Sequence, residues 1–229
     1  MIVYGRNAVR ELLRAGRRPV RRLWATRRAA EEPWLHGLEV RIAGPDELER
    51  LCGSSGHQGL CAETGPYPYA GEDEILAQPD PLIVVLDEVQ DVQNVGAVCR
   101  TAECAGAAGV VIPERRSAEV TPAVCKASAG AVEWLRIARV RNLADFLLAA
   151  REAGCWSYGA AAGARTPYDA PDYRGGVVLV LGAEGRGLRR RVAETCDDLV
   201  ALPMRGHVDS LNVSAACAAL LYEILQRRP

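Results

Sequence analysis

Several residue types and patterns are scarce in this chain of 229 residues. It contains one Phe, and aromatic residues make up 5% of the whole, which argues against a platform for stacking single-stranded nucleobases. No apolar run approaches the roughly 18 residues that span a bilayer. The start, residues 1–6, lacks the apolar core of a secretory signal. We therefore expect a cytoplasmic protein with no membrane-spanning part.

Cysteine is present but lacks the spacings that mark special chemistry. None of the eight cysteines forms a Cys-x-x-Cys pair, so the pattern matches neither a zinc site nor a small disulfide framework. Several lie in apolar stretches, where a free Cys acts as a small hydrophobic residue. We expect reduced, mostly structural thiols and no metal site.

The net charge of the chain is −1, but the charged residues are distributed unevenly along it. Residues 1–28 contain nine Arg and one Glu, whereas residues 29–91 contain two Arg and fourteen acidic residues. A basic N-terminal element suits an RNA-anchoring module, because phosphate contacts supply most nonspecific affinity; a solvated helix face explains the charge equally well. Lys126 is the one lysine. The preference for Arg is explained by a GC-rich genome as well as by forked phosphate contacts.

Residues 1–64 are predicted to form a small α/β domain. Val9, Leu12 and Leu13 share one face of a helix over 7–14. We expect strands at 20–25, 38–42 and 59–63, and a helix at 45–51. Gly, Pro and acidic residues then dominate residues 65–80, which we interpret as a linker.

Residues 81–229 are predicted to form a larger domain. The run 82–86 is apolar throughout, which is typical of a strand buried on both faces of a parallel sheet. We expect further strands at 109–112, 156–160, 177–181 and 198–202, and helices at 95–107, 122–129, 143–153 and 210–227. Alternating strands and helices imply a parallel α/β sheet covered on both faces. Ligands of such sheets bind beyond the carboxyl ends of the strands.

Two of these strand ends carry distinctive segments. Asn94 and Arg100 follow the strand at 82–86, although Asn94 is also explained as a helix cap and Arg100 as a partner of Glu103. Gly182-Ala183-Glu184-Gly185-Arg186-Gly187 follows the strand at 177–181, without the spacing of a dinucleotide turn. Glu184 would repel a phosphate but suits a cationic sulfonium or a ribose hydroxyl.

A third polar segment follows the strand at 198–202. It contains Pro203 and Met204 and leads to Ser210-Leu211-Asn212 at the start of the last helix. Ser210 is also explained as the cap of that helix.

Together these segments resemble the three motifs of the SpoU branch of the SPOUT methyltransferases. The matching residues are Asn94-x-Gly96-x-x-x-Arg100-Thr101-Ala102, Leu181-Gly182-Ala183-Glu184-Gly185-x-Gly187, Leu202-Pro203-Met204 and Ser210-Leu211-Asn212-Val213-Ser214. Residues 4–9 and His57-Gln58-Gly59 are similar to the start and end of the family's substrate-binding domain. Among subfamilies, the chain is most similar to the 23S rRNA guanosine 2′-O-methyltransferases, also through Lys126–Ala131.

The resemblance implies a fold, a reaction and partners. It implies a C-terminal domain with a trefoil knot, a small L30e-like N-terminal domain that binds RNA, and a homodimer with its active site at the subunit interface. Such an enzyme transfers a methyl group from S-adenosylmethionine to a ribose 2′-hydroxyl of RNA. The acceptor that the resemblance favours is a guanosine of 23S rRNA. There are two kinds of alternative. The enzyme could act on another RNA, either a tRNA or a different rRNA nucleotide as in antibiotic-resistance methylation, or the protein could have a non-catalytic role in ribosome assembly.

The resemblance also assigns roles to individual residues. The residues implied in catalysis are Arg100, Asn94, Glu184, Ser210 and Asn212. Those implied in cofactor binding are Leu181, Gly182, Glu184, Gly185, Leu202, Met204, Ser210 and Leu211. Those implied in RNA binding are Arg6, Arg10, His57 and Gln58. Because guanidinium stays protonated, we expect Arg100 to bind a phosphate and align the hydroxyl. His207 is a candidate base by its ordinary pKa, although the family pattern does not require a His there.

Overall fold

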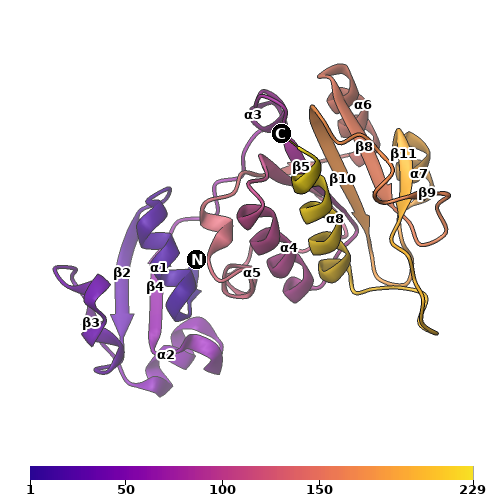
Figure 1. The fold of residues 1–229 in the computed structure, drawn as a ribbon. Helices are drawn as coiled ribbons and strands as arrows, with labels where there is room; N and C mark the ends of the chain where they lie inside the picture. The colour runs from indigo at the N-terminus through magenta and orange to yellow at the C-terminus, as the bar shows by residue number, and fades with distance from the viewer. Residues whose placement is uncertain (229) are drawn as a thin grey trace. The chain divides into compact units, whose positions relative to one another are not determined.

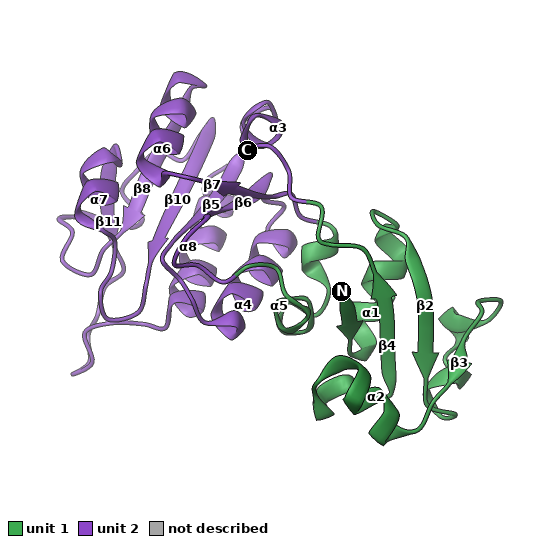
Figure 2. Cartoon of the chain, turned by 180° about the vertical axis from the view of Figure 1, so that it is seen from behind, with its two compact units in different colours: residues 1–68, 119–134 green, residues 69–118, 135–229 purple. Residues whose placement is uncertain are grey.

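The computed structural model describes residues 1–228, and their contacts divide the chain into two compact units. Unit 1 comprises residues 1–68 and 119–134, and unit 2 comprises residues 69–118 and the chain from 135 onwards (Figure 2). Segment 119–134 therefore leaves the chain of unit 2 and folds with unit 1. The domain boundaries expected at 64 and 81 stay predictions, because the contact division instead follows this excursion.

Unit 1 is built on a four-stranded sheet with the order β1-β4-β2-β3. Strand β4 is antiparallel to β1 and β2, and β3 pairs in parallel with β2. The elements are β1 Ile2–Tyr4, α1 Arg6–Ala15, β2 Val20–Ala25, β3 Arg41–Ile42, α2 Pro45–Cys52, β4 Leu60–Thr64 and α5 Pro122–Ala127, with single 3-10 turns at Ala29–Glu31, Pro33–Leu35, Ser55–His57 and Ala131–Glu133. Helix α1 buries Val9 and Leu12, the face that the sequence predicts.

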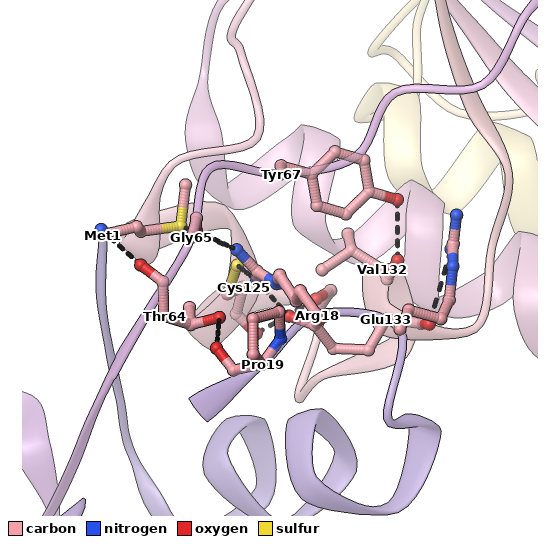
Figure 3. Close-up of polar contacts among 11 residues, drawn as sticks. Met1, Arg18, Pro19, Thr64, Gly65, Tyr67, Cys125, Val132 and Glu133 are labelled. Carbon is pink, nitrogen blue, oxygen red and sulfur yellow. Dashed lines mark hydrogen bonds and ion pairs between the residues drawn. The ribbon is translucent and has the colours of Figure 1, made fainter. Parts of the chain in front are cut away.

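A buried ion pair fixes segment 119–134 within unit 1. The side chains of Arg18 and Glu133 are 3% and 1% exposed and form a two-pronged pair, in which Arg18 Nε donates to Glu133 Oε2 at 3.1 Å. Arg18 Nη1 also donates to the carbonyl of Gly65 at 3.2 Å. The hydroxyl of Tyr67 donates to the carbonyl of Val132 at 2.7 Å (Figure 3). The segment is thus held by charge and by backbone contacts.

Unit 2 is built on a seven-stranded sheet with the order β7-β6-β5-β10-β8-β11-β9, and every neighbouring pair is parallel. Its strands are β5 Leu82–Asp87, β6 Gly109–Pro113, β7 Ile137–Val140, β8 Cys155–Ala160, β9 Thr166–Pro167, β10 Gly176–Gly182 and β11 Asp198–Ala201. Strand β10 comes late in the sequence but lies between β5 and β8 (Figure 1).

Helices cover both faces of this sheet, as the continuous apolar strands require. They are α3 Glu72–Leu76, α4 Val92–Cys104, α6 Leu143–Glu152, α7 Arg190–Thr195 and α8 Val213–Arg227. Residues of α3, α6 and α7 share one apolar core with β5 and β10. Helices α4 and α8 pack against each other, and α8 also packs on β10 (Figure 1).

Every strand and helix that the sequence predicts occurs, with ends shifted by at most three residues. The sequence reading missed β1, β7, β9, α3 and α7, which are too short for a clear periodicity. Helix α3 lies within residues 65–80, where we expected only linker, and its Ile75 is fully buried. The trefoil path of the chain stays a prediction.

Two further sequence expectations concern cysteines and membranes. None of the eight cysteines forms a disulfide within residues 1–228, and burial raises the pKa of the Cys125 thiol to about 12. A thiol with so high a pKa stays protonated and unreactive near neutral pH. Within residues 1–228, no helix combines the length and the apolar character needed to cross a bilayer.

The buried pair in unit 1 yields a stability prediction. Glu133→Gln is expected to lower the free energy of unfolding by about 3 kcal/mol, because it leaves the buried guanidinium of Arg18 without a counter-charge. Urea unfolding followed by tryptophan fluorescence measures the loss. Glu49→Gln, at an exposed position of α2, is the matched control.

A double variant separates charge from packing. Replacing both partners, as Arg18→Met with Glu133→Leu, is expected to recover most of the lost stability, since two apolar side chains leave no buried charge. An unfolding curve for Glu133→Gln that overlays the wild type would contradict the importance of this pair.

Candidate functional site

The carboxyl ends of β5 and β10 lie side by side in unit 2, since Asp87 pairs in register with Gly182. Asp87 is fully buried and accepts two hydrogen bonds from Arg189, one from its backbone N–H and one from its Nε, each at 2.7 Å. These bonds tie the end of loop 183–189 to the end of β5. The loop is therefore held over the edge of the sheet at both of its ends.

Gly182 permits this loop to fold back on itself. The N–H of Gly187 donates to the carbonyl of Ala183 at 2.8 Å, and a Cβ atom on Gly182 would lie 2.1 Å from the carbonyl carbon of Gly187. Gly185 and Gly187 have φ values of 75° and 65°, a region that side chains other than glycine disfavour. The glycine spacing is thus a requirement of the backbone.

A cavity of about 650 Å³ opens beside this loop, within unit 2. It is bounded by the loops that follow β8, β10 and β11 and by the start of α8. Its walls include all eight residues that the resemblance implies in cofactor binding: Leu181, Gly182, Glu184, Gly185, Leu202, Met204, Ser210 and Leu211. The structure gathers them; their contact with a cofactor stays a prediction.

Three of the residues implied in catalysis form one hydrogen-bonded cluster. The side-chain amide of Asn212 donates to Asn94 Oδ1 at 2.9 Å and to Glu184 Oε1. The Oδ1 atom of Asn212 accepts from the N–H of Ser214 at 2.9 Å and from its hydroxyl at 2.6 Å. Asn212 thus links α4, the glycine-rich loop and α8.

Two helix caps differ from the alternatives considered in the sequence. Asp91, not Asn94, caps α4 by accepting from the N–H of Gln93 at 2.7 Å. Asn212, not Ser210, caps α8. Because α4 begins three residues earlier than predicted, Asn94 lies inside the helix, buried at 7% exposure, and its side chain is available to Asn212.

Arg100 and Ser210 lie outside that cluster. Arg100 is exposed on α4, about 9 Å along the axis from Asn94, and no ion pair or hydrogen bond joins its side chain to residues 1–228, Glu103 included. Ser210 lines the cavity, and its hydroxyl donates to Asp209 at 3.3 Å. Arg100 is therefore an unpaired cation whose guanidinium can bind an anion.

His207 is exposed and does not contribute to the cavity walls among the described residues. A base must reach the proton that it removes, so nothing in this geometry favours His207 over water or an RNA phosphate. The proton acceptor stays open.

The residues implied in RNA binding lie in unit 1, and two of them have acidic partners. Arg6 pairs with Glu32 at 2.7 Å and Arg10 with Glu11 at 3.0 Å. Gln58 accepts from the N–H of Arg6 at 3.0 Å. His57 is buried, and its Nδ1 accepts from the N–H of Gly59 at 2.9 Å, which leaves Nε2 as its second polar atom.

Sequence reasoning missed part of this site. Ala160–Ala162 and Ala193 line the cavity, but alanines carry no chemical signal. Asp87 did carry one, because it is an acidic residue directly after the apolar run 82–86. Its partner Arg189 lies 102 positions away, a pairing that only the folded sheet reveals.

The glycine-rich loop yields a prediction for ligand binding. Gly182→Ala is expected to weaken binding of S-adenosylmethionine by at least tenfold, because the added methyl group overlaps the backbone of Gly187 and displaces the loop. Isothermal titration calorimetry measures the affinity. Gly163→Ala is the control, since a Cβ there meets no atom within 4 Å; equal affinities of the two variants would contradict the role of the loop.

Comparisons with known families now add to this geometry. Residues 81–222 match the model of the SpoU rRNA Methylase family, and residues 2–70 match that of the RNA 2′-O ribose methyltransferase substrate-binding domain. Together these two models span most of the chain, including the cavity and the Asn212 cluster.

Individual proteins agree with these matches. The 23S rRNA (guanosine-2′-O-)-methyltransferase RlmB of Pseudomonas putida is 38% identical, over 99% of this chain and 96% of its own length. YacO of Bacillus subtilis, named for the TrmH family of tRNA/rRNA methyltransferases, is 37% identical over 99% and 95%.

A solved structure is similar over the same length. The SpoU methyltransferase AviRb of Streptomyces viridochromogenes, in complex with the cofactor AdoMet, has a TM-score of 0.84 at 26% identity and covers 99% of this chain and 89% of its own. The likeness thus extends over both units and both matched families. This chain belongs to the SpoU rRNA methylase family.

Proposed function

We propose that this protein transfers a methyl group from S-adenosylmethionine to a ribose 2′-hydroxyl of RNA, and that the acceptor is a guanosine of 23S rRNA. The observation that carries the proposal is the hydrogen-bonded cluster of Asn94, Asn212 and Glu184, of which Glu184 lines the cavity. The cluster thus connects a cavity residue to Asn94 on α4, the helix that also carries the exposed Arg100. Relatives named for 23S rRNA guanosine methylation support the choice of acceptor.

The cavity suits S-adenosylmethionine in shape and charge. The loop that Gly182 allows to fold back bounds the cavity, and the glycines of that loop allow a flat ligand such as an adenine to approach the backbone closely. Leu202, Met204 and Leu211 supply apolar walls. Glu184 supplies a carboxylate, which tolerates a cationic ligand better than a phosphate. When bound, S-adenosylmethionine supplies the electrophilic methyl group of its sulfonium.

The chain's own residues would then hold and orient the acceptor. Arg100 would bind a phosphate next to the target ribose, and this contact would align the 2′-hydroxyl. Asn94 and Ser210 would hydrogen-bond the ribose. Asn212 would keep Asn94 and Glu184 in place, because its amide already donates to both.

A homodimer completes the proposal. The apolar residues of α8 fall into two groups, of which Cys217, Leu221 and Ile224 are buried within unit 2. Tyr222 and Leu225 of α8 remain 45% and 40% exposed. These exposed side chains, close to the cavity walls of α8, support a second copy of the chain as the partner of this face.

Arg100→Ala is expected to lower the rate of methyl transfer about a hundredfold, because the acceptor loses its alignment. The affinity for S-adenosylmethionine is expected to stay within about twofold, since Arg100 is not among the cavity walls. Single-turnover transfer and calorimetry measure the two quantities. Arg174→Ala, which removes an exposed cation of unit 2, is the control.

A loss of cofactor affinity equal to the loss of rate would contradict the role of Arg100. Arg100→Lys adds a further test. It keeps the charge but not the forked donors, so it is expected to recover only part of the rate.

Mapping of ribose methylation in a strain that lacks the gene tests the acceptor. We expect one guanosine of 23S rRNA to lose its 2′-O-methyl group and to regain it with the wild-type gene but not with the Arg100→Ala gene. Unchanged 23S rRNA together with a lost tRNA mark would contradict the rRNA assignment. Failure of the purified protein to bind S-adenosylmethionine would favour a non-catalytic role in ribosome assembly.

A further inference from the structure

Lys126 lies in unit 1 although its position falls within the range of the methylase family model. It is the one lysine among 28 basic residues, so arginine serves at every other basic position of the chain. Helix α5 carries it into unit 1 on segment 119–134. The one lysine of the chain also has an unusual environment within unit 1.

The Lys126 side chain lies in a slot between two glycines. A Cβ atom on Gly5 would stand 2.8 Å from its Cδ and 3.0 Å from its Nζ, and one on Gly56 would stand 3.5 Å from its Cε. The same point on Gly5 is 3.4 Å from Oε1 of Gln58. Gln58, which the family resemblance implies in RNA binding, therefore borders the same slot. A slim, unbranched lysine fits this slot, whereas a planar guanidinium is wider.

The ammonium has no counter-charge within the described chain. No hydrogen bond or ion pair joins it to residues 1–228, whereas Arg6, which follows Gly5 in the sequence, and Arg10 are paired with acids. Burial lowers the pKa of Lys126, and this effect outweighs the opposing one of Cys52. A partly buried ammonium without a partner is unfavourable, and the first turn of α1 contains no acidic residue to offset it.

The segment that carries Lys126 is rigidly held. Besides the pair of Arg18 and Glu133, a Cβ atom on Gly130 would stand 2.6 Å from Cβ of Glu11, so the backbone of the segment abuts α1. The indole of Trp134 donates to Glu11 Oε2 at 3.0 Å. Such fixing limits the freedom of α5, the helix that carries Lys126, before any ligand binds.

We propose that Lys126 binds a backbone phosphate of the RNA substrate, and that segment 119–134 contributes this residue to the RNA-binding surface of unit 1. A phosphate supplies the charge that the slot lacks, and its oxygens accept from the ammonium. Gln58 then provides a neighbouring polar contact. This inference rests on the proposed function, because RNA is taken as the substrate.

Kinetics of a charge-neutral variant test the proposal. Lys126→Met keeps most of the packing and removes the charge. With deproteinised 23S rRNA that lacks the modification, the KM for RNA is expected to rise about tenfold, as for one lost charge-assisted hydrogen bond. The kcat at saturating RNA and the affinity for S-adenosylmethionine are expected to stay unchanged. Arg190→Ala, which removes an exposed cation on α7, is the control and is expected to keep the wild-type KM.

The salt dependence of RNA binding gives an independent readout. Loss of one phosphate contact is expected to reduce the slope of log affinity against log salt by about 0.7 to 0.9. A purely structural role would lower affinity without changing this slope. A Lys126→Met protein with the wild-type KM and slope would overturn the proposal, while methyl transfer by the wild type would leave the proposed function intact.

The wild-type protein allows a test that does not depend on the folding of a variant. Because the chain has one lysine, acylation of its ε-amine can be followed by mass spectrometry of a single peptide. RNA is expected to slow this acylation at least severalfold. An acylation rate that RNA does not change would overturn the proposal.

Discussion

The pairing of β5 with β10 is the constraint on which the site of unit 2 depends. It brings Asp87 next to Gly182 in register, although 95 positions of sequence separate them by numbering. The fully buried carboxylate of Asp87 then has one available set of donors, the N–H and guanidinium of Arg189. A buried charge without partners is costly, so the fold holds the glycine-rich loop closed wherever this sheet is formed.

With the loop closed, the parallel sheet accounts for the rest of the cavity. Parallel strands end at the same edge, so the segments after β8, β10 and β11 meet there. Alanines and leucines from these segments line the cavity together with Glu184, Arg186, Asp209 and Ser210, and Asn212 joins Asn94 to Glu184. Glu184 is therefore the residue at which the cavity and the hydrogen-bonded cluster of Asn94 and Asn212 meet.

How far the sequence could anticipate this depends on the range of each interaction. The apolar run of β5 and the spacing of α1 are local patterns, so these elements were predicted correctly. The helix caps were not: Asp91 and Asn94 are both good capping residues, and only the burial of Asn94 against Asn212, 118 positions away, decides between them. The same reason applies to two ion pairs, Asp87 with Arg189 and Arg18 with Glu133. Neither pair can be predicted from the sequence, because no residue near either member indicates its partner.

Segment 119–134 shows why matched family ranges and physical units need not coincide. The methylase family model includes this segment, yet Glu133, the carbonyl of Val132 and Gly130 contact Arg18, Tyr67 and Glu11 of unit 1. The chain therefore passes between the units at 68, at 118 and again at 134, rather than through one linker. Unit 1 thus includes residues from within the range of the methylase family model. Its surface therefore cannot be inferred from the N-terminal sequence alone.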